Sequence, residues 1–454
     1  MLSQNGRRRP ALLAPALLAP AKLAPAKLAA KLTVKLAMSG LVVFCAIALA
    51  ALPGTARAAE PRTASAAAIA DAIRDNQEWV FGMLNVTAAW PRSEGAGVTV
   101  AVIDSGVDPY VSDLIGSVTT GPDFTGVSTA PASQNWGVHG TWMASLIAGH
   151  GHGGGSGVLG VAPRARILSI RVIPDRTDPH YSRYEREQEA SIQQSLANGI
   201  NYAVARGAQV ISMSIGYSAP SGTVRAALQR AYDRGVVVLA SAGNSGDQAG
   251  SGRSGQAPES FPADYPGVIS VGAVDSRGRV ASFSSANLSV QVAAPGVSVP
   301  AQGRDGQYWW VSGTSPACAL VAGVAALIKS KYPHLAPDLV ATALTTTTTD
   351  RPPGGYDSQV GFGVVDATAA LTKAAQLAHA PPVGATPAGT SSSGTTRGPV
   401  GVAAAARFHG TIPPAPVPAR GPGQLIGFAL LALASLALAG VAGTRLAFLR
   451  RARR

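Results

Sequence analysis

Short apolar runs alternate with amphipathic or small-residue stretches through the middle of the chain. Six runs are rich in β-branched residues and predict buried strands: 97–107, which enters a turn, 165–173, 208–216, 236–244, which runs into a Gly-Asn loop, 267–274 and 289–296. Stretches with helical character lie at 192–207 and 223–235, and each closes with a glycine. Continuous apolar strands separated by helices indicate a parallel sheet covered on both faces. The predicted fold class is therefore α/β, with working residues at the carboxyl ends of strands.

An apolar segment of a different kind lies near the C-terminus. Residues 425–444 carry no charge, and at ~1.5 Å per residue a helix of this length spans ~30 Å, the thickness of a bilayer core. A buried core helix is the alternative, but only residues 445–454 follow, and five of them are arginines. We therefore expect a single transmembrane helix with a basic cytoplasmic tail.

The N-terminal segment 1–58 has the pattern of a leader with a secretory signal peptide. An apolar core at 41–52 is followed by a Pro-Gly pair and then by Ala56-Arg57-Ala58, a small-x-small cleavage pattern. An uncleaved anchor is the alternative. The proline-rich repeat at 11–32 fits either a long leader or a start codon placed too early, with Met38 as another start. With the signal cleaved, the middle of the chain lies outside the cytoplasm.

The net charge of +13 is concentrated at the two ends of the chain. All 24 acidic residues lie between Glu60 and Asp366, whereas only 21 of the 37 lysines and arginines lie between 60 and 380. The middle is thus slightly acidic, which argues against a nucleic-acid partner. The two cysteines, Cys45 and Cys318, cannot form an internal disulfide once the leader is removed.

Composition divides the remainder of the chain. Residues 376–424 are rich in proline, glycine, serine and threonine, so they predict an extended or flexible linker. The folded part then covers a short N-terminal extension, 59–92, and a single domain, 93–375. The extension is short for a unit that folds alone, and we expect it to lie along the domain.

Three patterns at predicted strand or helix ends carry candidate chemistry. Asp104 directly follows a strand, His139 opens a small-residue helix, and Ser315 stands at another helix start. Taken singly, they are also typical of a turn residue, a core histidine and an N-cap. Together they supply the nucleophile, base and orienting carboxylate that acyl transfer requires. Asn244, after another strand, adds an amide donor for a developing oxyanion.

The order Asp, His, Ser and the surrounding residues resemble those of the subtilisin-like serine peptidases, or subtilases. The similarity spans 97–371, and the motifs occur in the family's order: VAVIDSGVD, HGTWMASLIAG, GVLGVAP, ASAGN and GTSPACALVAGVAAL. It implies a three-layer sandwich with a mainly parallel central sheet. It also implies that Asp104 orients His139, that His139 is the general base, that Ser315 is the nucleophile, and that Asn244 binds the oxyanion.

The resemblance further implies residues that contact an extended peptide substrate. An edge strand and the wall of the first specificity pocket are expected at Ser214, Ile215 and Gly216, and at Ser241, Ala242 and Gly243, respectively. Pro316 departs from the family, in which methionine, phenylalanine or leucine often follows the nucleophile. Proline fits the first turn of a helix, although it provides no backbone N–H near the oxyanion.

Residues 78–108 resemble the start of the mycosins, the membrane-anchored subtilases of type VII secretion systems. This resemblance implies a serine endopeptidase with a protein or peptide substrate, held at the cell membrane by one span and associated with a type VII secretion complex. The alternative is a scaffold that stabilises such a complex, with hydrolysis secondary or absent.

Other patterns predict no metal or cofactor. His150 and His152 lie among glycines that offer no rigid ligand frame, and the segment is more typical of a mobile loop. The charged segment 175–190 predicts a solvated loop or helix start, with a partner surface as the alternative. Cys318, one turn after Ser315, is predicted to pack in the core.

Overall fold

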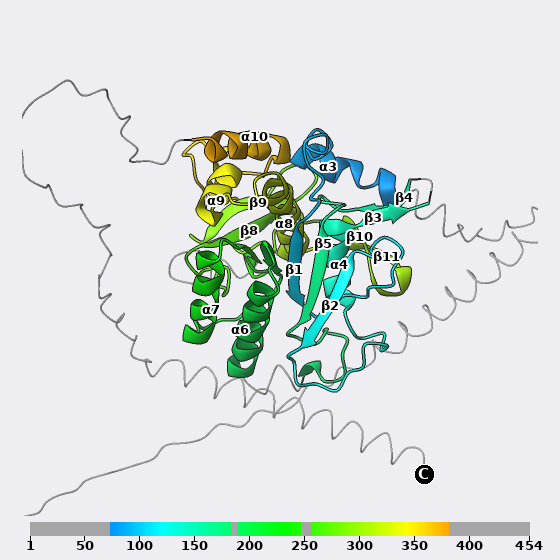
Figure 1. The fold of residues 1–454 in the computed structure, drawn as a ribbon. Helices are drawn as coiled ribbons and strands as arrows, with labels where there is room; N and C mark the ends of the chain where they lie inside the picture. The colour runs from blue at the N-terminus through cyan, green and yellow to red at the C-terminus, as the bar shows by residue number, and fades with distance from the viewer. Residues whose placement is uncertain (1–72, 154, 183–188, 247–255, 381–454) are drawn as a thin grey trace, which may run out of the picture. The chain divides into compact units, whose positions relative to one another are not determined.

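The computed structural model describes residues 73–153, 155–182, 189–246 and 256–380 (Figure 1). The predicted leader, most of the linker, the predicted transmembrane helix and the basic tail lie outside these residues. None of the helices in the described ranges is both long and apolar enough to cross a bilayer.

The core of the fold is a parallel sheet of seven strands in the order β2-β5-β1-β6-β7-β8-β9. Its strands are β1 Thr99–Asp104, β2 Val118–Asp123, β5 Arg166–Arg171, β6 Val210–Met213, β7 Val237–Ser241, β8 Val268–Val274 and β9 Val290–Pro295. Six of them confirm the strands predicted from apolar runs. The edge strand β2 was not predicted, because its sequence VTTGPD is largely polar and no residue in it is fully buried.

Helices cover both faces of this sheet, as predicted. On one side lie α6 Glu189–Ala205 and α7 Gly222–Asp233, which run side by side in Figure 1. The opposite face packs against α4 Val138–Ala148 and α8 Thr314–Lys331. Alternate residues of each strand enter opposite cores: Ala101 of β1 joins the core under α6 and α7, and Val100 joins the core around α8.

Smaller elements complete the domain. They are α3 Glu78–Leu84, α9 Pro337–Thr346, α10 Ala367–Ala378, the turn η2 Arg304–Gly306, and two hairpins, β3 His150–His152 with β4 Ser156–Leu159 and β10 Val299–Gln302 with β11 Tyr308–Val311. Helix α10 ends at Ala378 and so continues three residues past the predicted end of the domain at 375. The predicted glycine closures of α6 and α7 are present, because Gly207 and Gly235 both have φ 75°.

The N-terminal extension packs into the main core. Helix α3 buries Val80, Phe81 and Leu84 in the cluster that includes α4 and α8. Just before it, the Gln77 amide donates to the carbonyl of Leu159 and accepts from the N–H of the same residue, both at 2.9 Å. This part of the extension therefore lies along the domain as predicted.

His150 and His152 lie in a hairpin, so the prediction of a loop was wrong at these two residues. His150 and His152 form β3, and the ring Nδ1 of His152 lies 2.5 Å from the buried carboxylate of Asp113. The same carboxylate accepts the N–H of Val158 in β4 at 2.7 Å. Pairing to β4 and to Asp113 orders a segment whose composition alone is typical of loops. In the described ranges no three His, Cys, Asp or Glu side chains are placed to hold a metal ion.

Candidate active site

Two of the predicted site residues are in direct contact. Asp104 is the last residue of β1 and is 1% exposed, whereas His139, near the start of α4, is 31% exposed. The ring Nδ1 of His139 lies 2.9 and 3.0 Å from the two carboxylate oxygens of Asp104. A buried carboxylate at this nitrogen fixes the proton on Nδ1 and leaves Nε2 as the basic atom.

The first turn of α4 is held by side chains from other elements. The carboxylate of Asp175 accepts the N–H of Val138 at 2.8 Å and that of His139 at 2.9 Å. The next N–H, from Gly140, donates to the Ser105 hydroxyl at 3.1 Å. Helix starts leave such donors without partners inside the helix, so these contacts fix the backbone that carries His139.

Charges around His139 control its affinity for a proton. Burial by itself lowers the pKa of the imidazole, but the carboxylate of Asp104 and then that of Asp175 outweigh it, while Arg176 acts in the opposite direction. The net result is a His139 pKa above its ordinary value. Burial raises the pKa of Asp175, although its hydrogen bonds from the helix start oppose that change.

Ser315 lies in the first turn of α8 and is partly exposed. The N-cap of this helix is Gly313, so the alternative role of Ser315 as a capping residue was wrong. Pro316 occupies the same turn, where a helix makes no use of the missing N–H. In the described residues no hydrogen bond joins the Ser315 hydroxyl to His139, and such bonds often tighten only when substrate binds.

The amide of Asn244 is anchored to the start of α8. Its Oδ1 accepts from both the N–H and the hydroxyl of Thr314 at 2.9 Å. The Thr314 hydroxyl in turn accepts the N–H of Gly243 at 3.1 Å. Asn244 is exposed, and its donor atom Nδ2 lies 3.3 Å from where a Cβ on Gly313 would be. Thr314, which makes this connection, was not predicted as a site residue.

Two glycines shape the backbone around the site, one by close packing and one by a sharp turn. A Cβ on Gly140 would clash with the carbonyl oxygen of Gly106 and come within 3.3 Å of the Asp104 Cβ. Gly243 has φ 104°, a conformation that residues with a side chain rarely adopt, and it turns the chain directly before Asn244. Substitution at either position would disturb the strand ends that hold the site.

The predicted substrate-contact residues follow the two central strands. Strand β6 ends at Met213, so the predicted edge segment continues beyond the sheet, with Ile215 buried and Gly216 exposed. The Ser214 hydroxyl donates to the carbonyl of Ser315 at 3.4 Å, which places this segment beside the helix start. At the end of β7, Ser241 and Ala242 are buried, and Gly243 is partly exposed.

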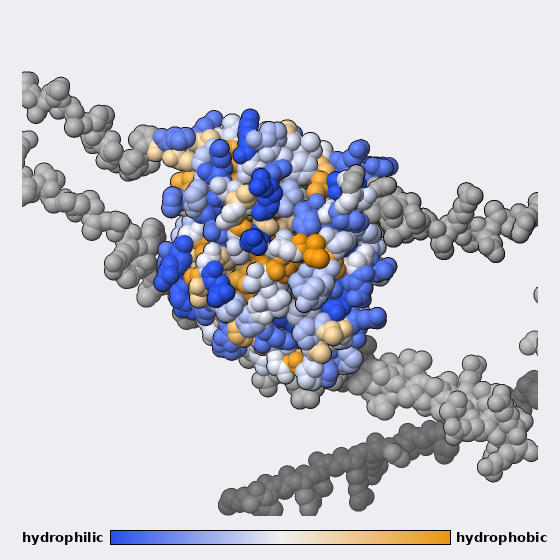
Figure 2. Space-filling view, turned by 45° about the vertical axis from the view of Figure 1, so that its right-hand side comes forward, coloured by the Kyte–Doolittle hydropathy of each residue, from blue (hydrophilic) through white to orange (hydrophobic). Residues whose placement is uncertain are grey.

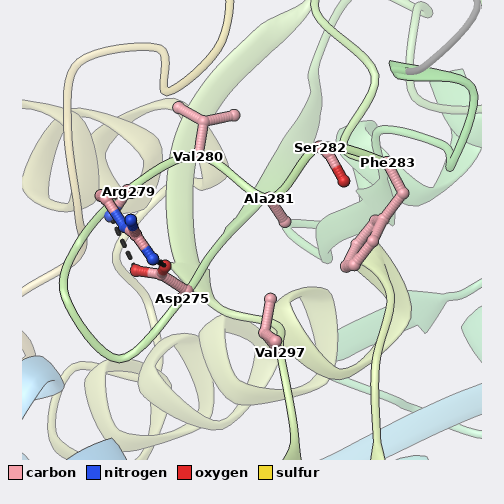
Figure 3. A pocket seen from close by; sticks show the side chains of 7 residues that line it. All are labelled: Asp275, Arg279, Val280, Ala281, Ser282, Phe283 and Val297. Atoms are coloured by element: carbon pink, nitrogen blue, oxygen red, sulfur yellow. Dashed lines mark hydrogen bonds and ion pairs between the residues drawn. The ribbon is translucent and has the colours of Figure 1, made fainter.

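A cavity of about 380 Å³ lies beyond the carboxyl end of β8 (Figure 3). Its walls are Asp275, Arg279, Val280, Ala281, Ser282, Phe283 and Val297. Arg279 forms a 2.6 Å ion pair with Asp275, so the charges on one side of the cavity neutralise each other. The carbonyl of Phe283 accepts the N–H of Gly246, which connects the cavity to the loop of Asn244.

Cys318 packs in the core, as predicted. It is 0% exposed, and its Sγ lies 3.9 Å from the Ser212 hydroxyl and 3.9 Å from the carbonyl of Met213. Burial raises the pKa of the thiol to about 12, so the nucleophilic thiolate is scarce at neutral pH.

Native protein treated with iodoacetamide at pH 8 should therefore leave Cys318 unmodified, because reaction requires both access and a thiolate. Unfolding in guanidinium chloride should restore full alkylation. Mass spectrometry of the peptide that contains Cys318 measures both results and separates them from any reaction at Cys45. Equal alkylation of Cys318 in the native and unfolded states would contradict its burial in the core.

Two acids at the start of the charged segment 175–190 are buried, so the prediction that the segment is solvated was wrong for them. Asp175 and Asp178 are each 4% exposed. Arg171, at the end of β5 and 1% exposed, pairs with Asp178 at 3.1 Å and with Asp123 at 2.6 Å. The part of this segment nearest the sheet therefore helps to hold the backbone around the candidate site. An acid two residues after the end of the predicted strand 165–173 was the sequence signal for it.

Comparisons with known proteins find relatives of the folded domain. The model of the Subtilase family matches residues 95–363. Subtilisin DY from Bacillus licheniformis is 37% identical over 277 residues, which cover 61% of this chain and 92% of that protein. Among solved structures, MycP1 from Mycobacterium smegmatis aligns with a TM-score of 0.54 and 32% identity, over 64% of this chain and 84% of that one. The MycP3 protease from the type VII (ESX-3) secretion system gives 0.53 and 34%, over 65% and 88%.

Proposed function

Since the chain belongs to the subtilase family and is a subtilisin-like serine endopeptidase, we propose that Asp104, His139, Ser315 and Asn244 perform the hydrolysis. The observation that carries the assignment is the contact of 2.9 Å between His139 Nδ1 and the buried Asp104 carboxylate. The anchored amide of Asn244 beside the start of α8 supports it.

In the proposed reaction the Ser315 Oγ attacks the carbonyl carbon of the scissile bond, and its proton passes to Nε2 of His139. Asp104 keeps the other ring nitrogen protonated and stabilises the imidazolium that forms. The carbonyl oxygen becomes an oxyanion that accepts from Asn244 Nδ2, near the positive end of the α8 dipole. His139 then gives its proton to the leaving amine, and water repeats the sequence to release the acyl group from Ser315.

The substrate is proposed to bind as an extended peptide. Backbone groups of Ser214–Gly216 would pair with the peptide on the acyl side of the scissile bond, as an added strand does. The segment formed by Ser241, Ala242 and Gly243 would wall the pocket for the side chain before that bond. Support comes from the hydrogen bond between Ser214 and Ser315 and from the position of both segments directly after β6 and β7.

The cellular setting is also a proposal. The predicted signal peptide, the linker and the apolar segment 425–444 favour a single-pass protein whose peptidase domain is extracytoplasmic and whose tail is cytoplasmic. Two structural neighbours are a protease of the ESX-3 system and MycP1, described as an essential component of the ESX-1 system. They support association of this chain with a type VII secretion complex.

The assignment of Ser315 is tested with a fluorophosphonate probe, which labels only an activated serine. Purified full-length protein should be labelled, and Ser315→Ala should abolish the label, because the attacking oxygen is gone. Ser312→Ala is the matched control: Ser312 is an exposed serine three residues earlier, and its hydroxyl accepts the N–H of Ser298 at 2.9 Å. Labelling that persists in Ser315→Ala, or is absent from the unmodified protein, would refute the proposed site.

A further inference from the structure

An aromatic surface adjoins His139. Trp142 lies one turn later in α4, and its ring centroid is 6.1 Å from that of His139, with an edge-to-face arrangement. Trp309 of β11 packs on Trp142 with centroids 5.8 Å apart, and it is 48% exposed. Figure 2 shows one face of the domain, on which apolar patches lie among polar side chains. Trp309 and Trp310 are among the few large aromatic or aliphatic side chains that the described residues leave exposed.

The packing of these two rings imposes constraints on their surroundings. A Cβ on Gly303 would lie 2.5 Å from the Nε1 of Trp142 and 2.8 Å from the ring of Trp309, so only glycine fits between them. Within the described chain the buried Nε1 of Trp142 has no hydrogen-bond partner. A buried donor without a partner destabilises a fold. The stacking of Trp142 and Trp309 is therefore poorly explained by fold stability alone. This favours a functional role for the aromatic surface that the two rings form.

The position of this surface identifies the part of the substrate that can reach it. Helix α4 packs against α8, which carries Ser315, and against β1, β5 and β10, whereas the segments proposed for the acyl side follow β6 and β7. Strand β11, which carries Trp309, ends at Val311, four residues before Ser315. Trp142 and Trp309 thus border the site from α4 and β11, and not from the segments that follow β6 and β7. The leaving amine must approach His139 to receive its proton, which brings it toward these two rings.

We propose that Trp142 and Trp309 bind the side chain of the residue that carries the leaving amine, and that they select an aromatic or large aliphatic side chain there. This inference rests on the proposed hydrolysis at Ser315. Offset or edge-to-face contact with one further ring gives a preference of about tenfold over a small side chain.

Trp310 provides a matched control. It is the next residue in β11 and is 55% exposed. Successive side chains of a strand point to opposite faces, and within the described residues only Trp309 of this pair has a ring contact with Trp142. A specific role for Trp309 thus predicts that Trp310→Ala has no effect.

The test uses the partition of the acyl-enzyme between water and an added amine. Full-length protein is supplied with a peptide thioester, and phenylalanine amide or alanine amide is added as the acceptor. The amine nitrogen bonds to the acyl carbon, the bond to Ser315 Oγ breaks, and the amine proton passes through His139 to Oγ. The acceptor occupies the leaving-group side, so the ratio of peptide product to hydrolysed acid reports binding there, whatever the acyl preference is.

Phenylalanine amide should be favoured over alanine amide about tenfold in the unmodified enzyme and in Trp310→Ala. The preference should fall to about twofold or less in Trp309→Ala and return in Trp309→Phe. Probe labelling at the unmodified rate shows that each variant is folded. Equal partition of the two amines in the unmodified enzyme, or equal losses in both tryptophan variants, overturns this inference alone. Absence of Ser315-dependent turnover in the unmodified enzyme overturns the proposed function and this inference with it.

Discussion

Ser315→Ala should lower kcat for peptide hydrolysis about a million-fold, and His139→Ala should lower it by a similar factor. The two side chains act on one step, because the oxygen that attacks is the group whose proton the imidazole removes. The double variant should therefore be no slower than either single variant. Residual hydrolysis in all three would come from substrate binding and from the oxyanion donors of Asn244 and α8.

Measurement requires quantitation of peptide products over long incubations with protein prepared in parallel. Thermal unfolding provides the control for folding, and little change is expected because Ser315 and His139 are both partly exposed. A double variant whose loss is the product of the two single losses would contradict the shared step. It would mean that His139 and Ser315 act independently, in spite of the contact of His139 with Asp104.

The sheet could be predicted where burial controls the sequence. Strands β1 and β8, for example, are buried along almost their whole length and consist mostly of apolar residues. β2 lies at an edge of the sheet and its threonines are exposed, so its sequence has no run of apolar residues from which a strand could be predicted. The β10–β11 hairpin was also missed, although Trp309 and Trp310 lie in it, because an exposed pair of tryptophans interrupts the alternation expected of a strand.

The candidate site residues could be predicted from the sequence because they stand at the ends of predicted strands and helices. Asp104 and Asn244 each stand at a predicted strand end, and the three roles of acyl transfer limit which residue types can combine. The residues that hold His139 in place could not be predicted in the same way. Asp175 meets the first turn of α4 from a segment 36 residues away in sequence, so only the tertiary fold brings its carboxylate to His139.

Asp175 also makes the site sensitive to pH in a way that sequence patterns do not indicate. Its charge and that of Asp104 raise the pKa of His139 against the effect of burial, and Arg176 lowers it. His139 must be neutral to accept a proton, so activity falls as pH decreases through its pKa. For the unmodified enzyme, the acidic limb of kcat/KM should thus lie above the ordinary imidazole value of about 6.5.

Asp175→Asn should reduce kcat by about ten- to a hundredfold and move the acidic limb to lower pH. Asparagine offers one oxygen where the carboxylate accepts two N–H groups, so one donor at the start of α4 loses its acceptor and the imidazole is less precisely held. The pH shift follows separately from loss of the negative charge, which lowers the pKa of His139. The measurement is kcat/KM as a function of pH, with thermal unfolding as the control for folding.

Arg176→Ala supplies a control of opposite sign. Arg176 is exposed and its positive charge lowers the pKa of His139, so removing it should move the acidic limb to higher pH, by a smaller amount, with kcat on the plateau retained. Opposite shifts in the two variants would establish that these charges act on the imidazole itself. A loss of activity in Asp175→Asn that is uniform across pH, with no displacement of the limb, would restrict Asp175 to holding the helix start and refute its electrostatic effect on His139.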